Sequence, residues 1–318
     1  MADVERHHWF VAPPLDGPIT GGTLFNRFLV EALESLGDQV SVVGSVDACE
    51  GFAWIDSLYL PRMEGRWTQQ PAGLFVHYLP SVFEGRSELT PFEVDALAGA
   101  STLMCTGAWM REAIIGLGAD AERTAVVTPG VHAVEPVASL PESPVVAVVV
   151  GTVTERKGIL PLLEALRVRM PVGSWRLEVL GDLRADADYA SACQRTADGM
   201  PVVFRGAIPP PRAREAIAAS HMLLSAASVE SYGMAIAEAQ AFGVPVVARR
   251  GGHVAQLVET VPSGLLADDA AGVARAFCEL VEDPAGLAAR RHLSQGLRPR
   301  RTWLDAAREF RLLRACAS

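Results

Sequence analysis

The stretch Ser228-Val-Glu-Ser-Tyr-Gly-Met-Ala-Ile-Ala-Glu238, with its flanks, predicts a strand, a polar turn and a helix in succession. The apolar run 222–226 before it is typical of a buried strand, and strong helix formers begin at Met234 and continue to about Phe242. Gly243 suits the end of that helix, because glycine adopts a left-handed conformation easily. Residues 244–247 (Val-Pro-Val-Val) predict the next strand, which completes a β-α-β unit.

The turn between this strand and helix suits a phosphate group. It holds Glu230, Ser231, Tyr232 and Gly233, and the free N–H groups of a helix start attract an anion together with the positive end of the helix dipole. Glu238 lies about 6–7 Å further along the helix, where it can accept hydrogen bonds from a ribose. Glu230 would face the other side of the phosphate. Taken alone, the two glutamates are more simply explained as solvated side chains of an ordinary β-α-β unit.

Length, composition and charge restrict the class of protein. A chain of 318 residues, half of them hydrophobic, can form two buried cores. The formal net charge of -9 argues against nucleic acid or an anionic membrane surface as a partner. No run approaches the ~20 apolar residues of a transmembrane helix, and the first residues lack the pattern of a signal peptide. The five cysteines are scattered, so we expect a cytoplasmic protein with reduced thiols.

The first part of the chain opens like a Rossmann-like domain. The predicted elements are a strand at 9–12, a loop at 16–22, a helix at 23–36 and a strand at 39–43. Gly21 and Gly22 alone predict only a turn before the helix, and His77, at the end of a buried strand, is usually a packed side chain. Residues 44–70 predict an ordered but irregular segment. The absence of Gly-x-Gly-x-x-Gly and Walker A motifs argues against a nicotinamide enzyme and a P-loop ATPase.

A second set of Rossmann-like elements follows residues 135–144, which hold three prolines in a polar setting and predict a linker. The run 144–151 is almost wholly apolar, as in a central parallel strand buried on both faces. We therefore expect domains at residues 1–138 and 144–300. A helix within 301–318 places Trp303, Ala307 and Phe310 on one stripe, and its arginines predict a solvated face rather than a binding patch.

Two charged clusters in the second domain have different interpretations. Arg156 and Lys157 stand at a helix start, where the dipole disfavours cations, so they indicate an anion such as a diphosphate. A solvated loop is the simpler alternative for this pair alone. Asp186 and Asp188 resemble an Asp-x-Asp metal site, but they precede a helix at about Tyr189, where acidic residues cap the helix. We predict no metal site.

Together these motifs resemble glycosyltransferase family 4. The resemblance rests on Glu230-x7-Glu238, the Gly-Val-Pro-Val-Val strand, Lys157-Gly158, the glycine pair Gly251-Gly252 and Gly264-Leu-Leu266. It covers residues 145–267 well and the first domain loosely. Thr152 stands where the family usually has an arginine, so one cation of the diphosphate site is missing, unless Arg156 supplies it.

The resemblance implies an α/β protein of the GT-B fold, with two Rossmann-like domains facing across a cleft and the terminal helix packed back on the first. It assigns the donor diphosphate to Arg156, Lys157 and the N–H groups of Ser231, Tyr232, Gly233 and Met234, with Gly21 and Gly22 facing it. Ala207 and Ile208 would border the nucleotide base, and Glu238 the ribose. Glu230 would contact the donor sugar, and His77 the sugar or the acceptor.

The function implied is a retaining, metal-independent transfer of a sugar from a nucleotide-diphosphate sugar, for which we expect UDP rather than GDP. The short first domain, which has no obvious membrane-facing basic helix, favours a small soluble acceptor over a lipid. No cofactor, nucleic acid or integral membrane contact is expected, and the oligomeric state is open. Two alternatives stay open: a nucleotide-sugar-binding protein without turnover, and a GT-B sugar-nucleotide epimerase. Thr152 and the compact first domain allow the non-catalytic alternative.

Overall fold

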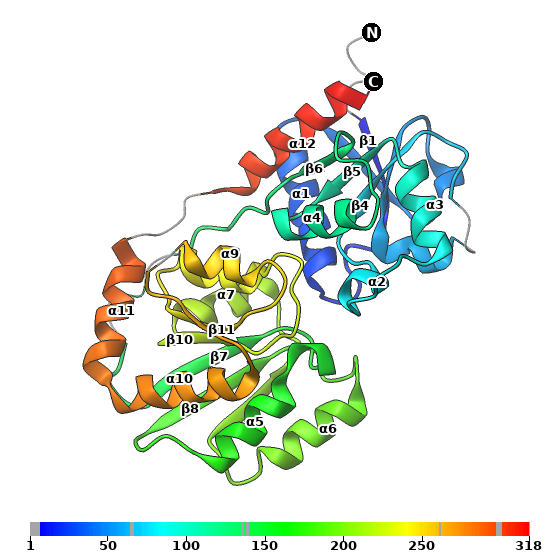
Figure 1. Ribbon diagram of the computed structural model, residues 1–318. Coiled ribbons are helices and arrows are strands. Elements are labelled where there is room, and N and C mark those ends of the chain that lie inside the picture. Colours follow the sequence, from blue (N-terminus) through cyan, green and yellow to red (C-terminus); the bar gives the residue numbers. More distant parts are fainter. Residues whose placement is uncertain are drawn as a thin grey trace. The chain divides into compact units, whose positions relative to one another are not determined.

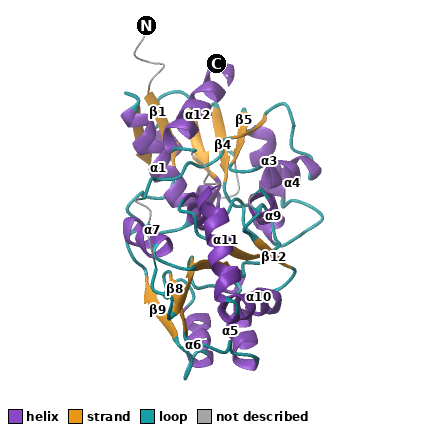
Figure 2. Ribbon diagram, turned by 90° about the vertical axis from the view of Figure 1, so that its left-hand side faces the viewer, coloured by secondary structure: helices purple, strands orange, loops and turns teal. Residues whose placement is uncertain are grey.

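The computed structural model describes residues 7–63, 67–134, 137, 140–260, 262–296 and 301–317. It divides into two compact units, one formed by Met1–Gly130 with Arg301–Ser318 and the other by Val131–Arg300 (Figure 1). In each unit the strands form a six-stranded parallel sheet, with helices packed against it (Figure 2).

The first unit has the sheet order β2-β1-β3-β4-β5-β6. Its strands are β1 His7–Val11, β2 Gln39–Val43, β3 Ala53–Asp56, β4 Ala72–Val76, β5 Thr102–Cys105 and β6 Thr124–Val126. Its α-helices are α1 Gly21–Ser35, α2 Pro80–Phe83, α3 Pro91–Gly99, α4 Ala108–Gly116 and α12 Trp303–Ala317, with short 3-10 turns η2 Val46–Ala48 and η3 Ser57–Arg62.

The second unit has the sheet order β12-β11-β10-β7-β8-β9. Its strands are β7 Val145–Val150, β8 Trp175–Leu180, β9 Val202–Gly206, β10 Met222–Ser225, β11 Val246–Arg249 and β12 Leu265–Ala267. Its helices are α5 Ile159–Val168, α6 Ala187–Thr196, α7 Pro210–Ala218, α8 Met234–Ala241, α9 Val254–Glu259, α10 Ala270–Glu282 and α11 Pro284–Gly296, with the 3-10 turn η4 Glu155–Lys157. One apolar cluster joins α5, α6 and α10 to one face of the sheet, and another joins α7, α8 and α9 to the other face.

Each sheet has a point where the strand order reverses. In the first unit the chain leaves β1 for β2 on one side and returns to β3 on the other; in the second, β7 and β10 flank the reversal. Loops that follow the two flanking strands diverge at the carboxyl edge of a parallel sheet, and ligands usually bind between them. The fold therefore draws attention to the loops after β1 and β3, and after β7 and β10.

Helix α12 returns to the first unit and packs beside α1 (Figure 1). Trp303, Ala307 and Phe310 are buried on one stripe, as predicted. The prediction of a solvated arginine face is wrong in part. Arg311 donates to both carboxylate oxygens of Asp38, at 2.8 and 2.6 Å, and Asp38 is almost fully buried. Burial alone would raise the pKa of Asp38, but hydrogen bonds from Arg311 and His8 lower it.

Three local predictions differ from the structure. Helix α1 begins at Gly21 rather than Thr23, because Thr20 and Thr23 form a reciprocal capping box. Segment 44–70 is not wholly irregular, because it contains the buried strand β3. Strand β11 begins at Val246 rather than Val244. The Val244 N–H donates to Ala239 O and so belongs to the end of α8, where Gly243 has a left-handed conformation.

The predicted linker 135–144 falls partly outside the described residues, which include neither 135–136 nor 138–139. Among the helices of the described residues, none is both long and apolar enough to span a membrane.

Candidate functional site

Three loops meet at the carboxyl edge of the second sheet, after β7, β10 and β11. The Ser228 N–H donates to Arg156 O at 2.9 Å, and the His253 N–H donates to Glu230 O at 2.9 Å. Glycines allow this backbone-to-backbone packing. A Cβ at Gly158, Gly251 or Gly252 would lie 2.1, 2.0 or 2.1 Å from the carbonyl oxygen of Ala226, Ser228 or Glu230. The three loops therefore form one fixed surface beside the reversal point.

Lys157 and Glu230, both predicted for the donor site, form an ion pair on this surface. Lys157 Nζ lies 2.5 Å from Glu230 Oε1, and each side chain is only 19% exposed. Lys157 is also the only lysine in a chain with 28 lysines and arginines together. Sequence reasoning missed that signal. A compact ammonium, rather than a guanidinium, stands where the two central loops meet.

Helix α8 starts beside this ion pair. Its N-cap, Gly233, has left-handed φ and ψ of 99° and 55° and no side chain to cap the helix. Ser231 and Tyr232 precede it, and the Tyr232 ring stacks on His253 with centroids 5.2 Å apart. Met234 is the first helical residue, so the helix start points its N–H groups toward the loop surface.

Glu238 lies one turn inside α8 and is partly exposed. Burial raises the pKa of its carboxyl to about 7, and the positive charge of Arg214 on α7 opposes this rise. A carboxyl with this pKa changes its protonation state near neutral pH.

The remaining predicted donor residues of the second unit lie on loops at the carboxyl edge of its sheet. Arg156 is exposed, while its backbone oxygen accepts the hydrogen bond from Ser228. Ala207 is exposed and follows β9 directly, after the left-handed Gly206. Ile208 packs on the apolar cluster beneath α7 and α8. The structure thus places these three residues at loops on the same edge of the sheet.

His77 lies in the first unit, immediately after β4, and is 5% exposed. Its Nε2 lies 3.0 Å from Asn26 Oδ1 and 3.9 Å from Asp56 Oδ2. Asn26 Nδ2 donates to the same oxygen of Asp56. Burial raises the pKa of Asp56 and lowers the pKa of His77, while the attraction between the two opposes both shifts.

The two predicted glycines of the first unit behave differently. A Cβ at Gly21 would meet open space, whereas a Cβ at Gly22 would lie 2.6 Å from Leu58 Cδ1 and 3.4 Å from His77 Cβ. Gly22 therefore lets α1 approach His77 closely, but the described contacts do not link Gly21 to that group.

Sequence reasoning missed Asn26 and Asp56. Asn26 is a fully buried polar residue on the apolar face of α1, and that mismatch could have identified it. Asp56 ends β3, the strand that was not predicted.

No group of three or more metal-ligating side chains occurs within the described residues. Asp186 caps α6 by accepting from the Tyr189 N–H at 3.1 Å, in agreement with its interpretation as a helix cap.

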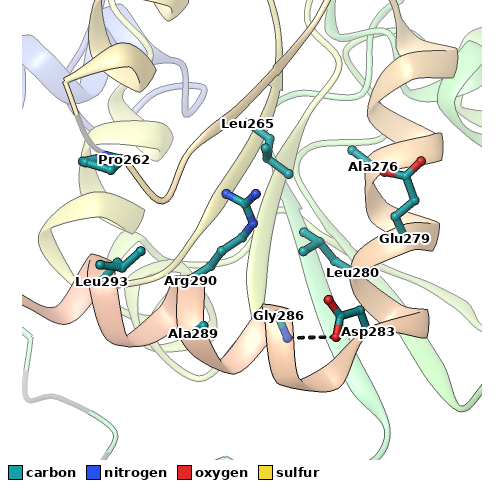
Figure 3. Close-up of a pocket in the computed structure, with 10 residues that line it drawn as sticks. All are labelled: Pro262, Leu265, Ala276, Glu279, Leu280, Asp283, Gly286, Ala289, Arg290 and Leu293. Atoms are coloured by element: carbon teal, nitrogen blue, oxygen red, sulfur yellow. Dashed lines mark hydrogen bonds between the residues drawn. The ribbon is translucent and has the colours of Figure 1, made fainter.

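A cavity of about 520 Å³ lies elsewhere in the second unit, between α10, α11 and the β12 region (Figure 3). Leu265 and Leu280 line it, with Glu279 and Arg290 among the charged residues. It contains none of the predicted site residues.

Residues 144–283 match the protein family described as "Glycosyl transferases group 1". A D-inositol 3-phosphate glycosyltransferase of Pseudarthrobacter chlorophenolicus is 34% identical over 143 residues, which is 42% of this chain. The sulfoquinovosyl transferase SQD2 of Arabidopsis thaliana is 29% identical over 118 residues, which is 37% of this chain. The chain covers only 34% and 22% of the lengths of these two curated relatives.

Solved structures resemble the whole chain. HepE of Anabaena, in complex with UDP and glucose, gives a TM-score of 0.77 at 17% identity and covers 98% of this chain and 100% of its own. The sucrose-phosphate synthase of Thermosynechococcus elongatus gives 0.76 at 18% identity, covering 98% and 99%. At such identities the likeness shows the fold, and the expected α/β GT-B architecture is confirmed. The chain thus has the GT-B fold, and its residues 144–283 match the group 1 glycosyltransferases.

Proposed function

We propose that this protein transfers a sugar from a nucleotide-diphosphate sugar to a small soluble acceptor. The observation that carries the proposal is the meeting of Lys157 and Glu230 at the start of α8, with Glu238 one turn further on. This arrangement offers a cation and helix N–H groups for a diphosphate, and carboxylates for the hydroxyl groups on either side. The name of the D-inositol 3-phosphate glycosyltransferase and the UDP-glucose complex of HepE support the same class of reaction.

Each predicted residue has a role in this reaction. Lys157, Arg156 and the N–H groups of residues 231–234 stabilise the negative charge of the departing diphosphate. Glu230 contacts the donor sugar, and Glu238 accepts hydrogen bonds from the ribose hydroxyls. Ala207 and Ile208 border the base. In the first unit His77 contacts the sugar or the acceptor, and Gly21 and Gly22 face the diphosphate.

Donor binding must rearrange the ion pair. In the structure Lys157 and Glu230 neutralise each other, and a bound diphosphate competes for the ammonium. Release of Lys157 frees the Glu230 carboxylate for the sugar, where positive charge develops as the anomeric bond breaks. The positive charge of Lys157 thus complements the negative charge of the departing diphosphate. The negative charge of Glu230 complements the positive charge that develops on the sugar in the transition state.

Retention of configuration needs no protein nucleophile in this proposal. The anomeric carbon–phosphate oxygen bond breaks while the acceptor oxygen attacks from the same face. The departing phosphate oxygen takes the acceptor's proton. Lys157 and the start of α8 supply the positive charge that a metal ion supplies in other glycosyltransferases, so turnover is expected without added divalent metal. We infer UDP rather than GDP, by analogy with HepE.

Nucleotide binding is tested by thermal unfolding of the full chain with UDP, GDP and their sugars. A nucleotide present at 100 times its dissociation constant adds about 2.7 kcal/mol of stability. We expect UDP to stabilise the wild type and the control variant Arg212→Met, whose surface arginine pairs with Glu215, and to stabilise Lys157→Met much less. Equal stabilisation of all three proteins would contradict the assigned site.

Thr152, which replaces the family's usual arginine, favours one alternative: a protein that binds nucleotide sugars without turning them over. Release of nucleoside diphosphate separates the alternatives. Release that depends on an acceptor indicates a transferase. Release without a second substrate other than water indicates an epimerase or hydrolase, and binding without release against a broad acceptor panel indicates a binding protein.

A further inference from the structure

Asn26, Asp56 and His77 form a hydrogen-bonded chain in the first unit that the donor site does not explain. They come from α1, β3 and the end of β4, beside the reversal point of the first sheet. Asn26 and Asp56 have no exposed surface, and His77 has 5%. Buried polar groups need matched donors and acceptors, so the direction of each hydrogen bond can be worked out.

Asp56 accepts hydrogen bonds at both carboxyl oxygens. The Leu58 N–H donates to Asp56 Oδ1 at 2.7 Å, and an amide N–H can only donate. Asp56 Oδ2 accepts from Asn26 Nδ2. Since both carboxyl oxygens face N–H donors, the carboxylate form satisfies these contacts, and an O–H at either oxygen would face a donor.

The orientation of the Asn26 amide determines whether His77 Nε2 donates or accepts. With Nδ2 facing Asp56, Asn26 presents its oxygen to His77 Nε2 at 3.0 Å. That oxygen can only accept, so Nε2 must carry a hydrogen. In a neutral imidazole the other nitrogen, Nδ1, then has a free lone pair.

The position of the ring is fixed as well. Ser57 Oγ accepts the N–H groups of His77 and Tyr78, at 2.9 and 3.0 Å. The Phe25 ring meets the imidazole edge-on, with centroids 5.0 Å apart. Gly22 allows α1 to lie against His77 Cβ. The surroundings therefore hold the imidazole in one place and one tautomer.

We propose that Asn26 and Asp56 are positioning residues that hold His77 in the Nε2–H tautomer, so that Nδ1 accepts a hydrogen bond from a hydroxyl group of the sugar or acceptor. The second half of this proposal rests on the proposed function, whereas the tautomer does not. The ligand class is a hydroxyl that donates. A fluorine substituent at the same carbon has a similar size but cannot donate, and is expected to be rejected.

The tautomer is tested by ¹⁵N NMR of the full chain labelled at histidine, with His77→Gln to assign the signal. Wild type should show a hydrogen on Nε2 and a free Nδ1. In Asp56→Asn the oxygen of the new side-chain amide still accepts from the Leu58 N–H. The NH₂ group of that amide therefore turns toward Asn26. The Asn26 amide must then flip and donate to His77 Nε2, which moves the imidazole proton to Nδ1. An unchanged Nε2–H tautomer in Asp56→Asn, or an Nδ1–H tautomer in wild type, would overturn the proposal.

Turnover gives a second readout. The kcat of Asp56→Asn should fall roughly 10- to 100-fold, which corresponds to about 1.4–2.7 kcal/mol, with little change in the donor KM. The matched control is Glu93→Gln, another buried carboxylate of this unit, which accepts from Ser81 and Thr90 instead. It should be less stable but keep the His77 tautomer and kcat.

Two outcomes keep the test decisive. If Asp56→Asn does not fold, Asp56→Ser replaces it, because a serine can still cap the Leu58 N–H. This variant removes the carboxylate oxygen that faces the Asn26 amide and should give a mixture of tautomers, and an unmixed Nε2–H form would refute the role of Asp56. If the wild type turns over no nucleotide sugar, the proposed function fails, while the NMR result still decides the tautomer.

Discussion

Replacement of Glu238 by glutamine should have two opposite effects, one on stability and one on nucleotide affinity. Burial raises the pKa of this carboxyl from 4.5 to about 7. Between these values the folded state binds more protons than the unfolded state, so stability falls as pH rises through the window and is lowest above pH 7. A shift of this size corresponds to at most about 3 kcal/mol. Glu238→Gln removes the charge, and should be more stable than wild type at pH 8, with the difference vanishing toward pH 4.

The same substitution should weaken nucleotide binding. Hydrogen bonds to a charged group are worth about 1.5–3 kcal/mol, which corresponds to roughly 10- to 100-fold in affinity for UDP at pH 8. In wild type the affinity should decline as pH falls below 7, because the carboxylate that we propose for the ribose hydroxyls becomes protonated. The variant should lack this part of the pH dependence.

Urea unfolding and titration calorimetry with UDP, at pH 5, 6 and 8, measure both effects. Glu215→Gln is the control, because Glu215 is an exposed carboxylate on α7 whose contact is a surface ion pair with Arg212. It should change neither quantity at any pH. A Glu238→Gln protein that is less stable than wild type at pH 8 would refute the reasoning about burial. An unchanged UDP affinity would refute the ribose assignment.

The other predictions concern charge pairs and thiols. Lys157 is the only side-chain amine of the chain, so an amine-selective reagent should label it. UDP at ten times its dissociation constant should slow that labelling about tenfold, and equal rates with and without UDP would place the diphosphate elsewhere. Arg311→Met should lower the free energy of unfolding by about 1–3 kcal/mol, because it leaves the buried Asp38 carboxylate with fewer donors; an unchanged urea midpoint would show that the pair is not stabilising. Burial raises the pKa of Cys105 to about 12 and of Cys193 to about 11, so a thiol reagent should modify both slowly at pH 8 until urea unfolds the chain, and rapid modification of the folded protein would contradict their burial.

Local patterns predicted the second unit well. Runs such as 144–151 are apolar throughout because β7 is buried between two layers, and Gly243 ends α8 because it adopts a positive φ. The stripe of Trp303, Ala307 and Phe310 followed from helical periodicity alone. In each case the physical cause acts within a few neighbouring residues.

The structure adds what depends on distant parts of the chain. Strand β3 has four residues, all buried, so it shows no alternation that would reveal it. Lys157 and Glu230 were each predicted for the donor site, but their ion pair joins residues 73 positions apart. Asn26 and His77 are 51 positions apart, and they meet because β3 lies between β1 and β4. The order of strands in a sheet decides such contacts, and residue spacing does not contain it.

The central claim is that the chain moves the sugar of a nucleotide-diphosphate sugar, with Lys157 on the diphosphate. Phosphorus and proton NMR of UDP-glucose, UDP-N-acetylglucosamine and GDP-mannose, each incubated with the full chain, EDTA and a pool of small hydroxylated acceptors, tests it most directly. We expect UDP to appear from a UDP-sugar, a product that keeps the donor's anomeric configuration, and a much slower reaction with Lys157→Met. Donors that all stay intact in the presence of folded wild-type protein, or release that is equally fast in Lys157→Met, would contradict the claim.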